Sequence, residues 1–352
     1  MNILGIDTSC DDTSAAVITD GNLVLSNVTN SQINLHNPYG GVVPELASRE
    51  HVRNIVPVVD EALMQAGIRL KEIDAIAVTI GPGLIGSLLV GLYYAKSLSY
   101  FNRIPLVGIN HLEGHILSIL LEDEHPSYPF AALTVSGGHT SLYYVQAPGN
   151  YEQLGQTLDD AAGEAFDKVA KILGLGYPGG AVIESVSRSG RADSIAFPRA
   201  YMSEESFDFS FSGLKTAVSL YIDKWKNQDR SIDNISMEDI AASFQEAVFD
   251  VLINKLIRAG IRKGTSSLML AGGVACNMTL RRKLTSQAEK EGMEVFYPRP
   301  EFCTDNGAMI ALAGYYRALN NEYADMYIDV RSRYPVKDIK VMNKQRRDMA
   351  AL

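Results

Sequence analysis

Short apolar runs separated by polar turns make up the beginning of the chain. Residues 3–6, 15–18 and 23–28 are apolar, and the stretches DTSCDD and TDGN lie between them. Runs of this length between turn residues predict a three-stranded meander. The same order returns after residue 128 as FAALTV, SGGH, TSLYYV, APGN and YEQLGQT. We therefore predict a duplicated domain, because a repeated order of strands and turns indicates an internal repeat.

Segments with helical periodicity follow each meander. Residues 45–66 carry an apolar stripe and end before Gly67, a residue that commonly stops helices. The stripe consists of Leu46, Val52, Val56, Val59 and Leu63. A strand at 75–79, the turn GPG, a long apolar helix from Leu84 and a strand at 107–109 come next. Alternating strands and helices of this kind predict an α/β protein.

The second half continues in the same way. A helix predicted from Ser236 has Asp239 three residues later, a variant of the capping box. The strand SLMLAGGV, a helix containing MTLRRKL, the strand EVFYP and a helix beginning near Asp305 follow. We expect an N-terminal domain of residues 1–118 with a returning segment 305–325, a second domain of residues 128–304, and a tail, 326–352, without a clear element.

The composition narrows the classes of protein. With 352 residues, 46% hydrophobic and 21% charged, the chain suits two globular domains. We see no export signal, and the longest apolar stretch, residues 84–98, is interrupted and too short for a membrane span. Three cysteines without close spacing argue against a disulfide framework or a cysteine zinc site. A cytoplasmic protein that does not bind membranes is expected.

The net charge of −9 argues against a surface that binds nucleic acid everywhere. A nucleic-acid substrate would need a local basic patch or a partner protein. Candidate patches are residues 224–226, 281–283 and 346–347, and the alternative for each is a solvated helix face.

Four turns rich in glycine or hydroxyl groups stand at predicted strand ends. They are DTS at Asp7, GPG at Gly81, SGGHT at Ser136 and AGGVACN at Ala271. Glycine lets backbone amides approach an anion closely, and neighbouring hydroxyls add donors, so such turns suit phosphate. We predict a nucleotide held between two related domains, with turns required only by sterics as the alternative.

The stretch NHLEGH places His111 and His115 one helical turn apart on the same face, a common geometry for two metal ligands. A third ligand is needed, and Asp305 in CTDNGA is the expected one. Two structural histidines are the alternative. The zinc-protease pattern H-E-x-x-H is absent from this stretch, because Glu113 stands two residues after His111, about 200° round the helix.

The helix LDDAAGEAFDKVAKILG is predicted to bury Phe166 and to leave Asp167 and Lys171 on another face, where a surface ion pair is the alternative to a functional role. The stretch GYPGGAVIES predicts a Pro-Gly-Gly turn, and FSFSGLKT, residues 209–216, predicts a loop of small polar residues. A ligand could approach the backbone at either of the last two.

Together these motifs resemble the TsaD family, the catalytic subunits of bacterial tRNA threonylcarbamoyladenosine synthesis that were once described as O-sialoglycoprotein endopeptidases. The resemblance covers residues 1 to about 320 and rests on GIDTSCDDT, YGGVVPELASREH, GPGLIGSLLVG, NHLEGH, VSGGHT, DDAAGEAFDKVAKILGLGYPGG, DFSFSGLKTA, AGGVACN and PEFCTDNGAMIA. The chain departs from the family pattern at Asp7, Ala181 and Glu184.

The resemblance implies a fold of two duplicated actin-like, sugar-kinase-like (ASKHA) domains with a ligand cleft between them. It implies a metal ion, Fe²⁺ first and Zn²⁺ second, on His111, His115 and Asp305. The residues it implies for adenylate binding are Thr134, Val135, Ser136, Gly137, Gly138, Asp167, Gly180, Glu184 and Asn277. The implied reaction moves the threonylcarbamoyl group of threonylcarbamoyl-AMP to the N6 amine of adenosine 37 in tRNAs that read codons beginning with A (ANN codons). Asp11 is our candidate for taking the amine proton.

By the same resemblance the partners are tRNA, the paralogous subunit TsaB and the small ATPase TsaE, with threonylcarbamoyl-AMP made by a separate synthase.

The sequence also allows other functions. The glycine turns alone suit a small-molecule kinase of the same fold. A scaffold subunit without catalytic activity is a third hypothesis, and a metalloprotease is the last because of the position of Glu113.

Overall fold

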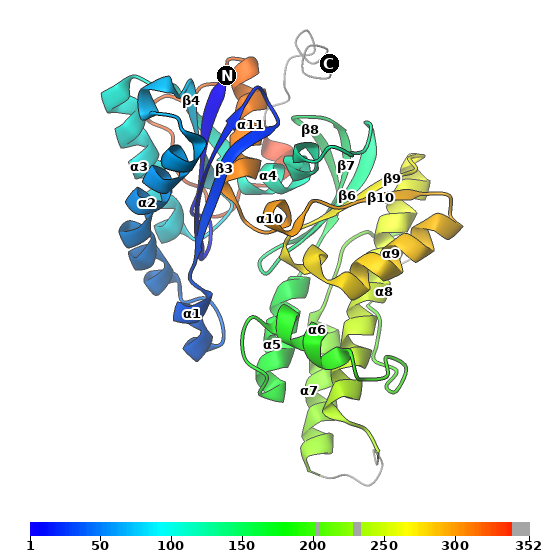
Figure 1. Ribbon diagram of the computed structural model, residues 1–352. Coiled ribbons are helices and arrows are strands. Elements are labelled where there is room, and N and C mark those ends of the chain that lie inside the picture. The colour runs from blue at the N-terminus through cyan, green and yellow to red at the C-terminus, as the bar shows by residue number, and fades with distance from the viewer. Residues whose placement is uncertain (201–204, 228–233, 340–352) are drawn as a thin grey trace.

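Two five-stranded sheets with the same topology form the framework of the protein (Figure 1). The computed structural model describes residues 1–200, 205–227 and 234–339. In the first sheet the order is β3-β2-β1-β4-β5, and in the second it is β8-β7-β6-β9-β10. The bounds of the strands are β1 Asn2–Asp7, β2 Asp12–Thr19, β3 Leu23–Ser31, β4 Ala75–Gly81, β5 Leu106–Asn110, β6 Phe130–Val135, β7 Thr140–Ala147, β8 Asn150–Gln156, β9 Ser267–Ala271 and β10 Glu294–Phe296.

The pairing of the strands repeats as well. In each sheet the first three strands pair antiparallel as a meander, and the last two add in parallel beside the first strand. The parallel additions are possible because helices make the crossover connections. Both predicted meanders and the α/β class are confirmed.

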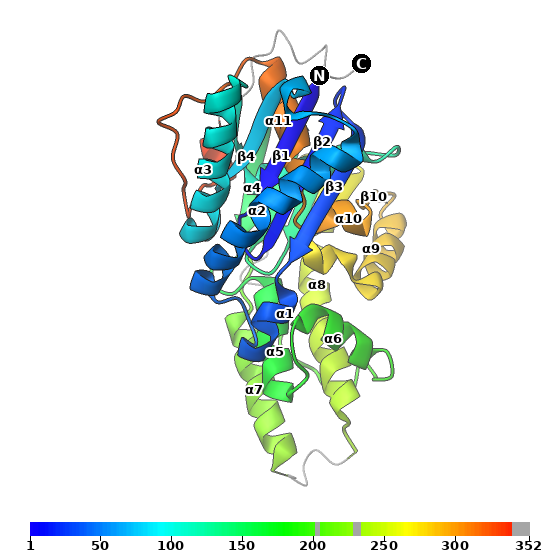
Figure 2. The same cartoon turned by 60° about the vertical axis from the view of Figure 1, so that its left-hand side comes forward.

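Helices cover both faces of the first sheet (Figures 1 and 2). On one face α2, Pro44–Ala66, and α3, Ile85–Asn102, pack against a core that includes Leu4 and Ile6 of β1. On the other face α4, His111–Leu117, and α11, Gly307–Leu319, pack against a core that includes Ile3. Side chains that alternate along β1 therefore face opposite layers.

The core around α4 and α11 also contains Phe130, Tyr143 and Met269 of the second sheet, so it joins the two halves. A separate core on the far face of the second sheet contains Phe166, Phe244 and Phe249.

The helices of the second half are α5 Ala162–Leu173, α6 Gly179–Ser187, α7 Ser212–Lys226, α8 Met237–Lys263, α9 Met278–Lys290 and α10 Pro300–Cys303. The predicted cap of α8 is confirmed, because the side chains of Ser236 and Asp239 each accept a hydrogen bond from the other's backbone N–H. Short helices lie at Ile33–His36 (α1), Asn37–Tyr39 (η1), Leu70–Glu72 (η2), Ser118–Leu121 (η3), Gly273–Cys276 (η5) and Val336–Asp338 (η6).

The predicted stripe of α2 is partly wrong. Val52 and Val56 are 63% and 48% exposed, and the buried face instead includes His51 and Ile55. His51 is buried because both ring nitrogens have partners, the Thr13 hydroxyl at 2.7 Å and the Cys10 carbonyl at 2.9 Å. A polar ring whose hydrogen bonds are satisfied can thus occupy a core position.

Two other expectations need correction. Residues 209–216 are not a loop throughout, because α7 begins at Ser212. The Pro-Gly-Gly segment is not a free turn, because Pro178 is the N-cap of α6, which starts at Gly179. In both places a short non-helical segment leads directly into a helix.

The last helix and the segment after it lie against the first half. Helix α11 packs on β1, β2 and β4, and Ala324 donates its backbone N–H to the Leu106 carbonyl. Residues 340–352, which include the basic pair 346–347, lie outside the described residues. The domain boundaries stay a prediction. Within the described residues no helix combines the length and apolarity that crossing a membrane requires.

Candidate metal and nucleotide site

The end of β5 positions the two histidines of NHLEGH. Asn110 is the N-cap of α4, and its side-chain oxygen accepts hydrogen bonds from the backbone N–H groups of Leu112 at 2.9 Å and Glu113 at 3.3 Å. This cap fixes the first turn of the helix. His111 and His115 therefore project from one face of α4, and they are only 3% and 1% exposed.

The structure brings Asp305 to this histidine pair. The residue lies between α10 and α11, and its Oδ1 is 3.0 Å from Nε2 of His115 and 3.4 Å from Nε2 of His111. One ligand atom from each of the three residues can be chosen so that all lie within 4.8 Å of one another. Two imidazoles and a carboxylate form a donor set that suits iron or zinc, so these residues form a group that could hold a divalent metal ion.

The second ring nitrogens of the two histidines differ in their surroundings. Nδ1 of His111 lies 3.1 Å from the Ser9 hydroxyl and 3.3 Å from Oδ2 of Asp7, which fixes the ring as second hydrogen bonds of metal-binding histidines usually do. Nδ1 of His115 is buried and has no hydrogen-bond partner among the described residues. Asp7 and Ser9 come from the DTS turn, which the sequence associated with phosphate rather than with the histidines.

The three residues of this group shift one another's pKa values. Burial alone would raise the pKa of Asp305, but the two imidazoles hold it well below its usual range. Burial likewise opposes the charged form of His111, but Asp305 and Asp7 raise the pKa of that ring well above its ordinary value. Because the Asp305 carboxylate is kept ionised beside two imidazoles, a metal cation can replace the proton that the imidazoles would otherwise bind.

Glu113 points away from the metal group, as the sequence predicted. It is fully buried and accepts hydrogen bonds from Arg317 Nη2 at 2.8 Å, Arg317 Nε at 3.0 Å and the Tyr151 hydroxyl at 3.0 Å. A carboxylate held in this way is not available as the base of a metalloprotease. Its role is to tie α4 to α11 and β8.

The SGGH turn joins β6 to β7 and is closed by its own hydrogen bonds. Ser136 donates its backbone N–H to the His139 carbonyl at 2.8 Å, and its hydroxyl accepts from the His139 N–H at 3.1 Å. A Cβ atom on Gly137 or Gly138 would meet no other atom within 4 Å. These two glycines therefore border open space where a ligand could approach the backbone.

A pocket of about 330 Å³ lies beside this turn. Six of the predicted catalytic and binding residues line it, namely Asp11, Gly137, Asp167, Gly180, Glu184 and Asn277. Thr304, which precedes the metal ligand Asp305, also lines it. The pocket and the metal group are therefore neighbours.

The other predicted binding residues do not line this pocket. Thr134 and Val135 are buried within β6, and the Thr134 hydroxyl donates to the Ser141 carbonyl at 3.4 Å. Ser136 and Gly138 belong to the turn but lie outside the lining. For Thr134 and Val135 the structure leaves only an indirect contribution, through the strand that carries the turn.

The polar side chains of the pocket accept hydrogen bonds from backbone N–H groups at the N-termini of α6 and α9. The Asn277 side chain caps α9 by accepting from Thr279 and Leu280, both at 3.0 Å. Glu184 accepts from the Met278 N–H at 3.0 Å, and Asp167 accepts from the Gly179 N–H at 2.7 Å. Asp167 is thus bonded to the start of α6, while Lys171 donates to the Tyr39 carbonyl, so the alternative of a surface pair between them is not what the structure shows.

Burial changes the ionisation of these acids. It raises the pKa of Asp167 to about 6. It also raises the pKa of Asp11, and the nearby charge of Asp305 acts in the same direction. Carboxyl groups with raised pKa values in a pocket are candidates for proton transfer.

Sequence reasoning missed His139 and Tyr177. The ring centroid of His139 is 6.3 Å from that of His111, and Tyr177 lines the pocket. Burial, together with the two neighbouring imidazoles, lowers the pKa of His139 to about 4, so this ring is neutral at pH 7. Both residues stand inside motifs already singled out, SGGHT and GYPGG, where only glycines and hydroxyls were considered.

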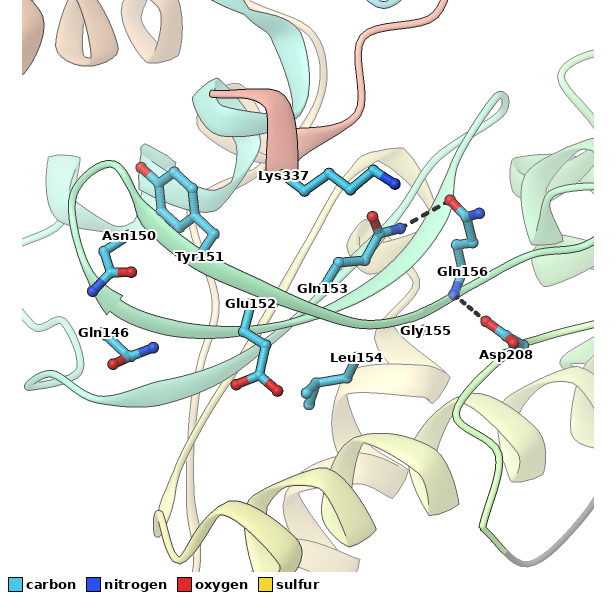
Figure 3. Close-up of a pocket in the computed structure, with 10 residues that line it drawn as sticks. All are labelled: Gln146, Asn150, Tyr151, Glu152, Gln153, Leu154, Gly155, Gln156, Asp208 and Lys337. Carbon is cyan, nitrogen blue, oxygen red and sulfur yellow. Dashed lines mark hydrogen bonds between the residues drawn. The ribbon is translucent and has the colours of Figure 1, made fainter. Parts of the chain in front are cut away.

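A second hollow of about 590 Å³ lies along β8 at the edge of the second sheet (Figure 3). Its lining includes Gln153, Gln156 and Lys337, and Asp208 holds the end of the strand by accepting the Gln156 N–H at 3.0 Å. None of the predicted site residues lines it. We therefore assign the chemistry to the smaller pocket.

Comparison with known proteins decides the family. A family model described as TsaD, tRNA N6-adenosine threonylcarbamoyltransferase, matches residues 23–312. The chain belongs to the tRNA N6-adenosine threonylcarbamoyltransferase family. It is 51% identical over 339 residues to the enzyme of that name from Geotalea uraniireducens (strain Rf4), covering 96% of this chain and 98% of the relative. Identity to the enzyme of that name from Desulfotalea psychrophila (strain LSv54 / DSM 12343) is 53% over 333 residues, 95% of this chain and 97% of the relative.

Solved structures agree with this family in fold. The (R)-2-hydroxyglutaryl-CoA dehydratase component A of Acidaminococcus fermentans superimposes with a TM-score of 0.54 at 17% identity, over 89% of this chain and 97% of that one. Full-length HypF in its phosphate- and nucleotide-bound form gives a TM-score of 0.59 at 14% identity, over 89% of this chain and 46% of that one. These likenesses confirm the actin-like ASKHA fold. The family assigns the chain to the transferases that modify tRNA, which favours that hypothesis over the kinase and the protease.

Proposed function

We propose that this chain transfers the threonylcarbamoyl group of threonylcarbamoyl-AMP to the N6 amine of adenosine 37 in tRNAs that read codons beginning with A. The observation that carries the proposal is the juxtaposition of the His111, His115 and Asp305 group with the pocket lined by Asp167, Gly180, Glu184 and Asn277. A carbamoyl adenylate needs one region for its nucleotide and another for its reacting carbonyl. The two neighbouring regions meet that need.

The reaction needs positioning more than strong acid or base chemistry. The mixed anhydride of threonylcarbamoyl-AMP is already activated, and the aromatic amine that attacks it is a weak nucleophile. Holding both reactants in one geometry and stabilising the developing charge therefore supply most of the acceleration. The open backbone at Gly137 and Gly138 lies where amide groups can face a phosphate or carbonyl oxygen.

His111, His115 and Asp305 would hold the metal ion, Fe²⁺ as the first candidate and Zn²⁺ as the second. When bound, the ion supplies Lewis acidity and a fixed positive charge. Asp167 and Glu184 offer carboxylate oxygens to the hydroxyl groups of the adenylate, and Asp11 is the proposed acceptor of the amine proton. Asp11 lines the same pocket, and its raised pKa makes it a better proton acceptor than an ordinary aspartate.

We propose a multiprotein complex in the cytoplasm as the working form. The partners are tRNA, TsaB and TsaE, and a separate synthase supplies threonylcarbamoyl-AMP. The net charge of −9 supports this part of the proposal, because an acidic subunit gains a basic surface for tRNA more readily from a partner than from itself.

The test combines the chain with TsaB, TsaE, unmodified tRNA and threonylcarbamoyl-AMP labelled in its threonine. Label should appear on tRNA with the wild-type chain and be lost with His111→Ala. His125→Ala, at an exposed histidine outside the site, is the matched control and should retain activity. Unlabelled tRNA from folded, metal-loaded wild-type protein would contradict the proposal.

A further inference from the structure

Two cysteines that are far apart in the sequence lie together at the wall of the adenylate pocket. Cys276 ends η5, which leads into α9, and Cys303 ends α10. The Gly272 N–H donates to the Cys303 carbonyl at 3.1 Å, and the Cys303 thiol donates to the Gly272 carbonyl at 3.3 Å. Cys276 and Cys303 are both free thiols, and the elements that carry them, η5 and α10, pack against each other.

The surroundings of the two sulfurs differ. Cys276 is partly exposed and lines the pocket, whereas Cys303 is fully buried. Arg281 lies beside them, with Nη2 3.6 Å from the Cys303 sulfur, and is held there by the Ala275 carbonyl at 2.6 Å and the Pro298 carbonyl at 2.9 Å. A small solute can therefore reach the Cys276 thiol, whereas the Cys303 thiol is shielded from solvent.

The same contacts favour the thiolate of Cys276. The neighbouring Cys303 thiol lowers the pKa of Cys276 to about 7, and the Arg281 charge acts in the same direction, whereas Cys276 and burial raise the pKa of Cys303, so Cys276 is the thiolate of the pair and Cys303 the thiol. The thiolate is the form of cysteine that reacts with peroxides, and reactive cysteines are commonly exposed and next to a resolving cysteine.

We propose that Cys276 and Cys303 are a redox pair that a hydroperoxide converts reversibly to a disulfide, and that the disulfide weakens binding in the adjacent adenylate pocket. The proposed disulfide depends only on the two cysteines and their surroundings, whatever ligand the pocket binds. The effect on the pocket rests on the proposed function, because it assumes that an adenylate binds there.

The chemistry balances with hydrogen peroxide as the oxidant. The Cys276 thiolate attacks one peroxide oxygen, the O–O bond breaks, and the departing hydroxide takes up a proton to form water. The resulting sulfenic acid of Cys276 is then attacked by the Cys303 sulfur, so an S–S bond forms and the S–O bond breaks. The departing hydroxide takes the Cys303 proton and forms a second water. Two thiols lose two electrons in total, and one peroxide gains them.

The position of the pair connects oxidation to the pocket. Asn277 directly follows Cys276, and Asp305 comes two residues after Cys303. Forming the disulfide removes the Cys303 hydrogen bond to Gly272 and moves the Cys276 sulfur out of its present place in the pocket wall. We expect AMP, used as the probe, to bind about tenfold more weakly to the oxidised protein, which is about 1.4 kcal/mol.

The experiment uses the full chain loaded with Zn²⁺, because this ion has no redox chemistry of its own. Reduced protein is treated with hydrogen peroxide, free thiols are blocked, and peptides are mapped without reduction. A Cys276–Cys303 disulfide is expected in wild type and in Cys10→Ser, and dithiothreitol should remove it. In Cys303→Ser, dimedone should trap the sulfenic acid on Cys276. A disulfide or adduct at Cys10, or no disulfide in wild type, would overturn the pairing.

Calorimetry with AMP tests the consequence on the same samples. The affinity should fall on oxidation of wild type, recover with dithiothreitol and stay constant in peroxide-treated Cys276→Ser. An unchanged affinity after complete disulfide formation would overturn the proposed effect on the pocket. Absence of AMP binding to the reduced wild type would instead count against the proposed function, and the peptide map would still decide the pairing.

Discussion

The buried pair between Glu113 and Arg317 allows a sharp test of how the two halves are held together. The side chains of Glu113 and Arg317 are 0% and 8% exposed, and two N–H groups of Arg317 reach the carboxylate. Tyr151 of β8 donates a third hydrogen bond to it. Arg317→Met keeps much of the side-chain volume but removes the charge and its donors.

The expected loss in the free energy of unfolding comes from the buried Glu113 carboxylate that remains after Arg317 is replaced. Without Arg317 the Glu113 carboxylate remains buried with the Tyr151 hydroxyl as its remaining donor among the contacts described above. Removing one partner of a buried ion pair usually costs about 3–5 kcal/mol, whereas replacing both partners with uncharged groups is often close to neutral. Arg317→Met should therefore lower the free energy of unfolding by about 3–5 kcal/mol. The double variant Glu113→Gln/Arg317→Met should recover part of that loss, because no buried carboxylate remains at position 113, although Glu322, the second partner of Arg317, still loses its cation.

Urea unfolding followed by circular dichroism and by tyrosine fluorescence measures this difference, and coincidence of the two signals checks that the transition is cooperative. The control is Arg49→Met, which removes the partner of Glu45 in a pair whose side chains are 70% and 74% exposed. That change should cost less than about 1 kcal/mol, because exposed ion pairs contribute little. A similar small loss for Arg317→Met, or a double variant less stable than either single one, would refute the assignment of Glu113 as a buried structural acid.

Three further outcomes are expected. Asp305→Ala should lose bound metal in elemental analysis while its circular dichroism spectrum is retained, and full metal content would contradict the ligand assignment. AMP affinity should fall as the pH drops below about 6, because burial raises the pKa of Asp167 to about 6 and the ionised carboxylate is the better hydrogen-bond acceptor. In calorimetry, Asp167→Asn should bind AMP more weakly than wild type at pH 8 and should not show the loss of affinity below pH 6. Gly272→Ala should lower the melting temperature, because φ is +95° and the new Cβ would lie 2.4 Å from the Val135 carbonyl oxygen, whereas Gly273→Ala meets no atom within 4 Å and should melt like wild type.

Local patterns in the sequence were enough to predict both meanders and several helices, although the starts of α6 and α7 were taken for a turn and a loop. The meanders follow from short apolar runs between turn residues, and the start of α8 follows from Ser236 and Asp239, which contact each other across a single helical turn. The spacing of His111 and His115 likewise predicts a shared helical face without any knowledge of the fold. All of these interactions join residues that are close in the chain, so their geometry is set by the backbone of one element.

Contacts between distant segments could not be predicted in this way. His51 is buried in place of Val52 because the ring finds partners on Thr13 and Cys10, and no periodicity of α2 reveals them. Glu113 is a structural acid only because α11 and β8 deliver donors to it.

The site shows the same division. Sequence alone supplied the histidine pair, the SGGHT turn and a family resemblance that pointed to Asp305. The packing of α10 and η5 brings Cys303 near Cys276, although the wide spacing of the three cysteines had argued against a disulfide framework. Tertiary structure decides such pairs because burial, hydrogen-bond partners and pKa values depend on which elements pack together, and the spacing along the chain carries no record of that packing.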